Sequence, residues 1–484
     1  MKGRVQVFLF YDKPNRGSLN ALCGAFERAG LGEIADLHLV REREELVARV
    51  LGVVDATTAA FAAPPPRGAA ATPSTDQPPK LRPPPLGEAR RGALSPTLVC
   101  ISFATPQYWG IRDLLAALAD RPAGTWLVAG GPHPTAMPEQ TLAMGFDVVV
   151  TGAGEQAFVD LVREMADASP GPWAPAAVAD APAVPPGVPS RPDASPEPSP
   201  PRPMSSMRPM RPIRPIRPIP PPLPLPPSVA PSFGAVGPVE ITRGCPFRCG
   251  YCQTPRIFPG PPQHRSIDDI ASQLAEQRGH RLRDFRFITP NAFGYGAGPG
   301  KTNPAAVEAL LSAAAEAVRG GRVFFGTFPS EVRPEAVLPE MLELVRRFAH
   351  NDNLTLGLQT GSERLLATIG RGHTVADVFR AVDLSSRAGF AMNVDVIFGM
   401  PDETEEDADE TLRVMRELIG IGARIHAHSY VPLPGTPWWP RPPAPTPPRL
   451  DAALNHLIPT GRLFGHWQAQ RKLAARILQD LAQS

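Results

Sequence analysis

Three cysteines lie close together in the sequence, with the spacing Cys245-x3-Cys249-x2-Cys252. Thiolates bind zinc ions and iron–sulfur clusters, and both commonly take four protein ligands. The other cysteines, Cys23 and Cys100, are distant in sequence, and we interpret them as buried thiols. A loop that offers only three thiols predicts a [4Fe–4S] cluster with one iron open to a chelating substrate. A zinc site completed by a distant histidine, or three buried thiols, are the alternatives that the spacing leaves open.

The residues around these cysteines suit a compact, negatively charged cofactor. Gly244 and Gly250 allow the loop to fold tightly. Arg243 and Arg248 would offset the charge of a cluster, and backbone N–H groups could donate to its sulfurs.

Two histidines form a second candidate group. His426 and His428 alternate along a strand that we expect within residues 423–435, so both side chains share one face. If that face is the interior of a barrel, one of them is a candidate for proton transfer. The alternative is a pair of packed or surface histidines.

Composition limits the class of protein. The chain has 484 residues, enough for two or three domains, and its net charge of +2 names no polyanionic partner. Five cysteines do not indicate a secreted disulfide framework. The N-terminal apolar run is short, and no run is long enough to cross a membrane. We therefore expect a cytoplasmic protein with free thiols and no membrane partner.

The 63 prolines are concentrated in two stretches, residues 59–96 and 169–236. Proline removes backbone donors and disfavours helix in the preceding residue, so we expect a disordered insert and a disordered linker. The repeat "RPMRPIRPIRP" in the linker could bind RNA, an acidic partner or a proline-reading module, but a solvated spacer is the simpler reading. Because such a linker is a loose tether, we expect the flanking domains to dock through the carboxyl ends of their own sheets.

The remaining sequence predicts two α/β domains. In residues 1–168, apolar strands alternate with amphipathic helices, which predicts a doubly wound parallel sheet. In residues 237–440, six further strands alternate with helices and predict a partial, six-unit β/α barrel. The tail, 441–484, is expected to form a helical extension. Ligands of such sheets bind beyond the carboxyl ends of the strands.

The segment "CPFRCGYC", with Tyr251 just before the last cysteine, resembles the radical S-adenosylmethionine (SAM) superfamily. The resemblance implies that an open iron binds the amino and carboxylate groups of SAM, which is then cleaved to a 5′-deoxyadenosyl radical. The segments "GLQTGSERLLATIGRGHT", "VDVIFGMPDET", "YVPLPGTPW" and "FPSEVRPE" extend the likeness. It implies a set of SAM contacts: Tyr251, Ser330, Glu331, Arg333, Gln359, Ser362, Ile397 and Gly399.

The N-terminal domain resembles the cobalamin-binding domain that precedes the barrel in one large radical SAM subgroup. The segments "SFATPQ", "GGPHPT" and "TGAGE" carry this likeness, and they imply corrinoid contacts at Ser102, Thr105, Gly130, Gly131, His133, Gly152 and Glu155. Cobalamin domains that supply a lower ligand carry D-x-H-x-x-G after the first strand. Here Pro14 stands at the histidine position, so a corrinoid would bind without that ligand.

The resemblance implies a radical SAM enzyme that uses a [4Fe–4S] cluster, SAM and cobalamin for methyl transfer or rearrangement. A small-molecule substrate and an electron donor of the flavodoxin or ferredoxin type are the expected partners, and nucleic acid is not expected. The alternatives are a cobalamin-free radical SAM enzyme and a non-enzymatic iron–sulfur or zinc protein that binds RNA through its Arg-Pro segment. Methylthiotransferases of tRNA share the radical core, but they need three further cysteines for a second cluster.

Overall fold

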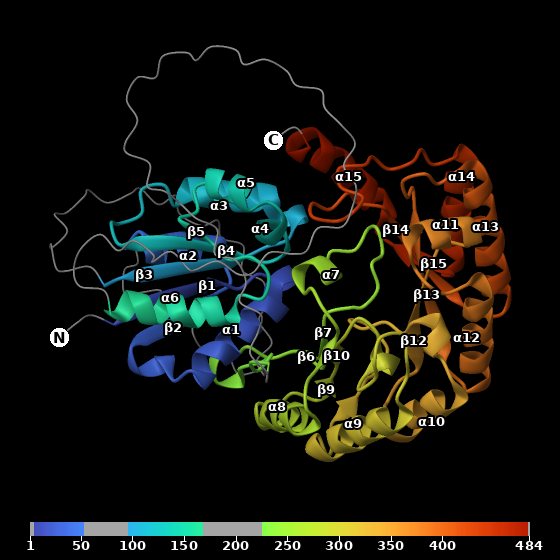
Figure 1. Cartoon of the computed structure of the whole chain (residues 1–484), viewed down its shortest axis with the longest axis horizontal. Coiled ribbons are helices and arrows are strands. Elements are labelled where there is room, and N and C mark those ends of the chain that lie inside the picture. Colours follow the sequence, from blue (N-terminus) through green and yellow to red (C-terminus); the bar gives the residue numbers. More distant parts are fainter. Residues whose placement is uncertain (1–3, 53–94, 168–224, 483–484) are drawn as a thin grey trace, which may run out of the picture.

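The computed structural model describes residues 4–52, 95–167 and 225–482, which form two α/β halves packed side by side (Figure 1). The predicted insert and most of the predicted linker, including the Arg-Pro repeat, lie outside the described residues. No helix in these ranges combines the length and the apolar character that a membrane span requires.

The N-terminal half is built on one parallel sheet. Its strand order is β2-β1-β3-β4-β5, which places the start of the chain in the middle of the sheet. The strands are β1 (Val5–Phe10), β2 (Ala35–Val40), β3 (Thr97–Ser102), β4 (Thr125–Gly130) and β5 (Val148–Val149). All four neighbouring pairs are parallel.

Helices cover both faces of this sheet. Apolar residues of α1 (Arg16–Arg28) and α6 (Glu155–Asp167) pack on one face, and those of α2 (Arg43–Val50) and α3 (Tyr108–Ala117) pack on the other (Figure 1). The short helices α4 (Pro132–Ala136) and α5 (Pro138–Ala143) follow β4. Burial on both faces explains why the strands are continuous apolar runs. The predicted doubly wound sheet is confirmed.

The second half is a partial barrel of parallel strands. β6 (Val239–Glu240) pairs with β10 (Phe287–Ile288), and β9 (Asp284–Phe285) pairs with β11 (Arg322–Val323). A parallel bridge from Val332 to Leu356 leads to β12 (Asn353–Gln359), which is followed in the sheet by β13 (Ala391–Phe398) and β14 (Arg424–Ser429). A short antiparallel pair, β7 (Thr242–Arg243) and β8 (Gln263–His264), frames the cysteine loop.

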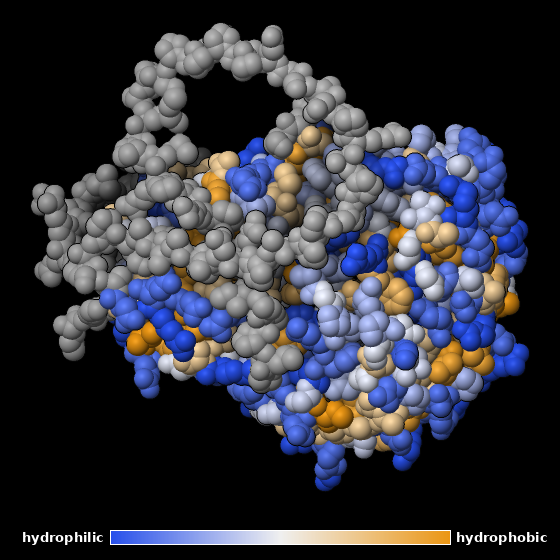
Figure 2. Space-filling model, in the orientation of Figure 1, coloured by the Kyte–Doolittle hydropathy of each residue, from blue (hydrophilic) through white to orange (hydrophobic). Residues whose placement is uncertain are grey.

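The outer helices follow the strands in order. They are α8 (Ile267–Gly279), α9 (Pro304–Ala317), α10 (Pro339–Phe348), α11 (Glu363–Ile369), α12 (Val375–Arg387) and α13 (Glu405–Gly420). Their outer surface is mainly hydrophilic, with scattered apolar residues (Figure 2).

The alternation of side chains separates the two faces of β13 and β14. Val394 and Val396 of β13, with Ile425 of β14, belong to the large apolar core. Asp395, between the two valines, and His426, next to Ile425, point to the opposite face, which is the interior of the barrel. The interior face carries polar groups at Asp395 and His426, so the same strands hold the core on one side and chemistry on the other.

The C-terminal tail contains more than the predicted helical extension. Between α14 (Pro448–Leu457) and α15 (Trp467–Leu481), residues Leu463–Gly465 form β15, which pairs in parallel with β14. The tail thus adds a strand to the barrel sheet. The sequence analysis expected only helices here, because a strand of three residues is too short to show the alternation of apolar and polar residues.

The last part of the predicted linker is packed rather than disordered. Arg265 donates to the carbonyl oxygens of Leu225 and Pro226 at 3.1 and 2.8 Å, and Ser228 donates to Gln273 at 2.9 Å. Leu225 is 2% exposed. Buried carbonyl and side-chain partners thus hold a proline-rich segment in place without a helix or a strand.

The two halves dock through the carboxyl-end loops of their sheets, as predicted. Trp109, after β3, donates from Nε1 to Asp480 of α15 at 2.7 Å and packs on Ile477. A Cβ on Gly435, after β14, would lie 2.9 Å from Ala136 of α4. The ion pair between Arg243 and Glu155, at 2.7 Å, also joins the halves.

We predict that Gly24→Ala destabilises the protein by about 1–3 kcal/mol, because overpacking strains a close contact. A Cβ at Gly24 of α1 would lie 2.3 Å from the carbonyl oxygen of Pro227, whereas one at Gly32 would meet nothing within 4 Å. Gly32→Ala is the matched control and should change stability by less than about 0.5 kcal/mol. Urea unfolding followed by fluorescence measures both, and equal stabilities would contradict the packing of Pro227 on α1.

Candidate active site

The cysteine loop follows β7 and is anchored at its centre. Gly250 N–H donates to Ile369 O at 3.0 Å, and Trp438 N–H donates to Gly250 O at 3.2 Å. A Cβ at Gly250 would lie 2.3 Å from the Trp438 ring. The close approach of the indole ring therefore requires glycine at this position. The sequence analysis expected glycine here for another reason, a tight turn of the loop.

The three thiols of the loop differ in their exposure. Cys249 is buried, while Cys245 and Cys252 are partly exposed. Burial raises the pKa of the Cys245 and Cys252 thiols, and each neighbouring cysteine adds to the effect. Neither of these two thiols is therefore a ready thiolate by itself, and a bound metal centre would supply the positive charge that stabilises the thiolate form.

The spread of the thiols fits a cluster better than a single ion. Among the described residues, only Asp395, His426 and His428 bring three metal-ligating atoms within 4.8 Å of one another. The three cysteine sulfurs do not form such a group. A single zinc ion needs its ligands gathered about one point, whereas each thiolate of an iron–sulfur cluster binds a different iron.

The positive charge beside the loop comes from Arg371, which the sequence analysis missed. Its Nη1 lies 4.0 Å from Cys249 Sγ, and its Nη2 donates to Gly357 O at 3.2 Å. Burial alone would lower the pKa of Arg371, but Tyr251 and Cys249 raise it, so the guanidinium stays charged. Arg371 lies in the segment "GLQTGSERLLATIGRGHT", which the sequence analysis quoted for its family resemblance. The flanking Gly370 and Gly372 have positive φ angles of 75° and 79°, a conformation that favours glycine in this turn.

Arg243, which was expected to offset the cluster charge, points elsewhere. Its guanidinium donates to Glu240 at 2.7 Å and pairs with Glu155 of the N-terminal half at 2.7 Å. Burial alone would lower the pKa of Arg243, but these two carboxylates raise it. The expectation was wrong in direction because two carboxylates from other segments, Glu240 and Glu155, hold the guanidinium on the side of the N-terminal half.

Three of the expected SAM contacts are engaged in contacts within the protein. Ser330 Oγ donates to Phe287 O at 2.6 Å. Ser362 caps α11 and donates to Asp407 at 2.5 Å. Arg333 stacks on Phe247, with its guanidinium carbon 3.4 Å from the ring centroid, and donates to Arg371 O. These side chains shape the site, and their predicted contacts with a ligand stay predictions.

Gln359 and Glu331 lie in the barrel interior. Gln359 has a positive φ of 75°, rare for a residue with a Cβ, where the register between β12 and β13 shifts. A Cβ at Gly357 would lie 2.6 Å from the Gln359 amide and 3.0 Å from Glu331 Oε2. Burial, and then the Asp395 carboxylate, raise the pKa of Glu331.

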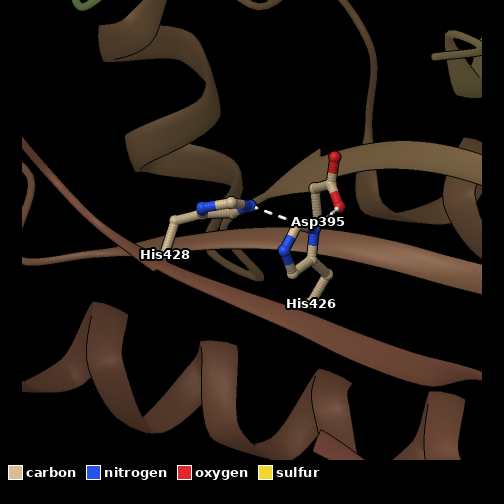
Figure 3. A group of neighbouring side chains, drawn as sticks. All are labelled: Asp395, His426 and His428. Atoms are coloured by element: carbon tan, nitrogen blue, oxygen red, sulfur yellow. Dashed lines mark hydrogen bonds and ion pairs between the residues drawn. The ribbon is translucent and has the colours of Figure 1, made fainter. Parts of the chain in front are cut away.

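The predicted histidine pair faces this interior (Figure 3). His426 Nδ1 lies 2.9 Å from Asp395 Oδ1 and 3.2 Å from His428 Nε2. Phe464 of β15 stacks on His426 with ring centroids 4.6 Å apart. The sequence analysis did not predict Asp395. It could have been found, because it is an acidic residue within the apolar strand of the segment "VDVIFGMPDET".

The hydrogen-bond partners of His428 decide between a metal site and a proton chain. Ser429 N–H donates to Gln470 Oε1 at 2.9 Å, so the Gln470 amide nitrogen faces His428 Nδ1 at 3.3 Å as a donor. Burial, and then His426, lower the pKa of His428, which is neutral near pH 7. Its proton is then on Nε2 and points to His426, where a metal ion would need a lone pair. The single in-plane site of His426 Nδ1 can either accept from His428 Nε2 or share a proton with Asp395 Oδ1, and exchange between these two states offers a route for proton transfer through His426 and Asp395.

An apolar wall closes the site beside the cysteines. Tyr251 and Ile397, both predicted, pack with Tyr430 and Trp438 around Cys249. Gly399 has a φ of 71°, and its carbonyl oxygen accepts from Ala444 N at 3.1 Å, so the segment after the barrel covers this edge.

A cavity of about 290 Å³ lies at the carboxyl ends of the N-terminal strands. Five of the predicted corrinoid contacts line it: Ser102, Gly130, Gly131, Gly152 and Glu155. The barrel half contributes Ser228, Glu240, Arg243, Ile257, Phe258 and Ile288. A Cβ on Gly131, whose φ is 97°, would lie 2.7 Å from Ser102 Oγ, so glycine keeps this corner open.

His133 and Thr105 do not line the cavity. Both are fully buried, and Thr105 Oγ1 lies 3.1 Å from His133 Nδ1. The imidazole packs against Phe103 and Tyr108, with ring centroids 5.2 and 5.3 Å away, and its burial lowers the pKa to about 4. In this arrangement His133 is a neutral packing residue, and the expected contact with a corrinoid has no support. Among the described residues, no histidine lines the cavity.

Two family models match the chain. The radical SAM superfamily matches residues 239–415, and the B12 binding domain matches residues 88–162. Both resemblances predicted from the sequence are thereby confirmed.

Curated relatives cover part of the chain. An uncharacterized protein of Methanopyrus kandleri is 27% identical over 243 residues, which are 49% of this chain and 46% of that protein. A tRNA-2-methylthio-N(6)-dimethylallyladenosine synthase of Sulfurihydrogenibium is 30% identical over 222 residues, 46% of this chain and 49% of that protein. The chain spans about half the length of these relatives.

Solved structures resemble the whole arrangement. The radical S-adenosylmethionine methyltransferase TsrM from Kitasatospora setae has a TM-score of 0.57 at 15% identity, covering 90% of this chain and 74% of that one. The cobalamin-dependent S-adenosylmethionine radical enzyme OxsB has a TM-score of 0.52 at 13% identity, covering 86% and 52%. At these identities the likeness shows a shared fold.

We predict that Gly250→Ala lowers the iron and sulfide bound after anaerobic reconstitution, because the added methyl displaces Trp438 or the loop. Gly298→Ala is the control, since a Cβ there would meet nothing within 4 Å. Iron and sulfide assays, with circular dichroism to check the fold, give the comparison. Equal loading in the two variants would show that the contact with Trp438 does not position the cysteines.

Proposed function

The chain carries a B12-binding domain followed by a radical SAM domain, and we propose that it is a radical SAM enzyme that uses cobalamin for methyl transfer or rearrangement on a small-molecule substrate. One observation supports this most strongly. The loop of Cys245, Cys249 and Cys252 begins two residues after Arg243, which lines the N-terminal cavity, and Cys249 lies beside the buried Arg371 of the barrel half.

The residues present fit the implied cofactors. Cys245, Cys249 and Cys252 would hold a [4Fe–4S] cluster, and the glycine-lined cavity would hold part of a corrinoid. When bound, the cluster supplies the electron that cleaves SAM to methionine and a 5′-deoxyadenosyl radical, and the corrinoid supplies a transferable methyl group.

The chain itself excludes water, places charge and holds a proton. Trp438, Tyr430 and Ile397 form the apolar wall around Cys249. Arg371 sets a buried positive charge beside the sulfur of Cys249, which suits both a negatively charged cluster and a carboxylate. Asp395 and His426, 2.9 Å apart, can hold and move a proton at Asp395 Oδ1 and His426 Nδ1 on the interior face.

The remaining cysteines argue against a second cluster of the tRNA methylthiotransferase kind. Burial raises the pKa of both Cys23 and Cys100 to about 12, so neither is a ready thiolate. Only these two are left outside the loop, in a chain of five cysteines. We therefore favour a small molecule over tRNA as the substrate.

Anaerobic reconstitution tests the proposal. The wild type should show the spectrum of a [4Fe–4S] centre, form 5′-deoxyadenosine from SAM on reduction, and retain added hydroxocobalamin. Cys249→Ala should reduce 5′-deoxyadenosine to background, because one iron loses its thiolate. Cys23→Ala should keep it. A zinc centre in the wild type, or full activity of Cys249→Ala, would refute the assignment; cluster activity without corrinoid would favour the cobalamin-free alternative.

We predict that Asp395→Asn keeps the reductive cleavage of SAM while losing turnover of a substrate that needs the proton. Asn has nearly the same shape as Asp but cannot accept a proton at this position. Chromatography of 5′-deoxyadenosine, with no substrate added, should give wild-type amounts for this variant. If Asp395→Asn instead behaved like Cys249→Ala, the Asp395–His426 pair would belong to the SAM site rather than to the substrate.

A further inference from the structure

Residues of the barrel half form part of the lining of the cavity at the N-terminal sheet. Gly130, Gly131 and their neighbours provide a lining of backbone and small side chains, whereas the barrel half contributes Glu240 and Arg243. With Glu155, these are the charged residues of the lining. Polar recognition of whatever occupies this cavity therefore depends in part on the barrel half.

Arg243 is only partly satisfied. It is 5% exposed, and its Nε and Nη2 are used by Glu240 and Glu155. Its Nη1 is buried and has no hydrogen-bond partner. Ser102 Oγ, across the same cavity, is also buried without a partner. A buried donor without an acceptor is costly, and each such group in a native fold needs an explanation.

The two carboxylates determine which acceptor suits the free nitrogen. Glu240 and Glu155 both lie 2.7 Å from Arg243 Nη2. Arg265, which pairs with Asp269 at 2.5 Å, lies 4.0 Å from Glu240, so the charge of the Arg243 guanidinium is already matched by carboxylates. An anionic group such as phosphate would meet three carboxylates together with two guanidinium groups, an excess of negative charge. A neutral acceptor, such as an amide carbonyl or a hydroxyl oxygen, accepts the hydrogen bond without that repulsion.

We propose that Arg243 is a corrinoid-binding residue contributed by the radical SAM domain, whose Nη1 donates to a neutral oxygen of cobalamin in the cavity of the B12-binding domain. This inference rests on the proposed function. Two parts of cobalamin carry such oxygens, the amide side chains of the ring and the nucleotide tail. Glu155 then has a different role from the one expected from the sequence: it holds the donor in place across the interface.

The position of Arg243 links the cavity to the cysteine loop. Arg243 ends β7, and Cys245 follows two residues later in the sequence. The Phe258 ring, on the far side of the loop, lies under the guanidinium, 5.1 Å from ring centroid to the guanidinium carbon. A ligand that holds Arg243 therefore also holds one end of the loop that carries the thiols.

Titration of the full-length protein with hydroxocobalamin tests the inference, with affinity measured by calorimetry and by absorbance after gel filtration. Arg243→Lys keeps a cation between the two carboxylates but removes the free Nη1, and should weaken binding about tenfold or more. Glu155→Gln keeps the guanidinium, an accepting amide oxygen beside it and its ion pair with Glu240, and should therefore weaken binding by less than about threefold. Arg322→Gln, in an exposed pair with Asp284, is the control and should bind as wild type.

Dicyanocobinamide, which lacks the nucleotide tail, identifies the acceptor. If Arg243→Lys weakens hydroxocobalamin alone, Arg243 binds the tail; if it weakens both, Arg243 binds the ring amides. Thermal unfolding must show that the variants are folded.

Three results would overturn the inference. Wild-type affinity in Arg243→Lys would remove Arg243 from the site while leaving the proposed function intact. Equal losses of hydroxocobalamin affinity in Arg243→Lys and Glu155→Gln would mean that Arg243 acts only through the ion pair that joins the two halves. No hydroxocobalamin binding by the wild type would defeat both this inference and the cobalamin part of the proposed function.

Discussion

The buried ion pair between Arg243 and Glu155 joins two parallel sheets at their carboxyl ends, and the candidate sites depend on that meeting. Each sheet alone presents an open edge of loops. Together they enclose a cavity that Arg243 of β7 lines, and the cysteine loop follows β7 directly. Burying charge is costly unless it is fully paired, so such a pair tolerates few alternative arrangements of the halves. Trp109 on Asp480 and Gly435 against Ala136 reinforce the same docking.

Within the barrel, successive residues of a strand point to opposite faces, so one face packs on the helices and the other carries polar groups. Val394 and Val396 hold the outer helices, while Asp395 faces His426 inside. Stability and chemistry therefore come from neighbouring residues with little competition between them. β15 contributes to both, since it extends the sheet and places Phe464 on the ring of His426.

Much of the site could be anticipated from local patterns, and the failures have physical reasons. The cysteine loop and the shared face of the histidine pair were predicted because spacing and alternation are local properties, whereas Tyr251 and Ile397 came from the family resemblance and their contacts with SAM stay predictions. Arg371 and Gln470 were missed because their roles come from contacts with residues that are distant in the sequence. Arg243 was assigned to the wrong partner, and His133 was assigned to a ligand although its ring is packed between Phe103 and Tyr108.

Residue type and spacing alone determined the local features from which a kind of chemistry was predicted: three thiols in one loop, a glycine-lined strand edge without a ligating histidine, and two α/β repeats. These follow from short-range rules that any segment obeys wherever it lies. Tertiary structure decides which charges face which cofactor. The direction of Arg243, the tautomer of His428 that Gln470 sets and the packing of residues 225–236 all depend on groups brought together from distant segments, and no local pattern encodes such a contact.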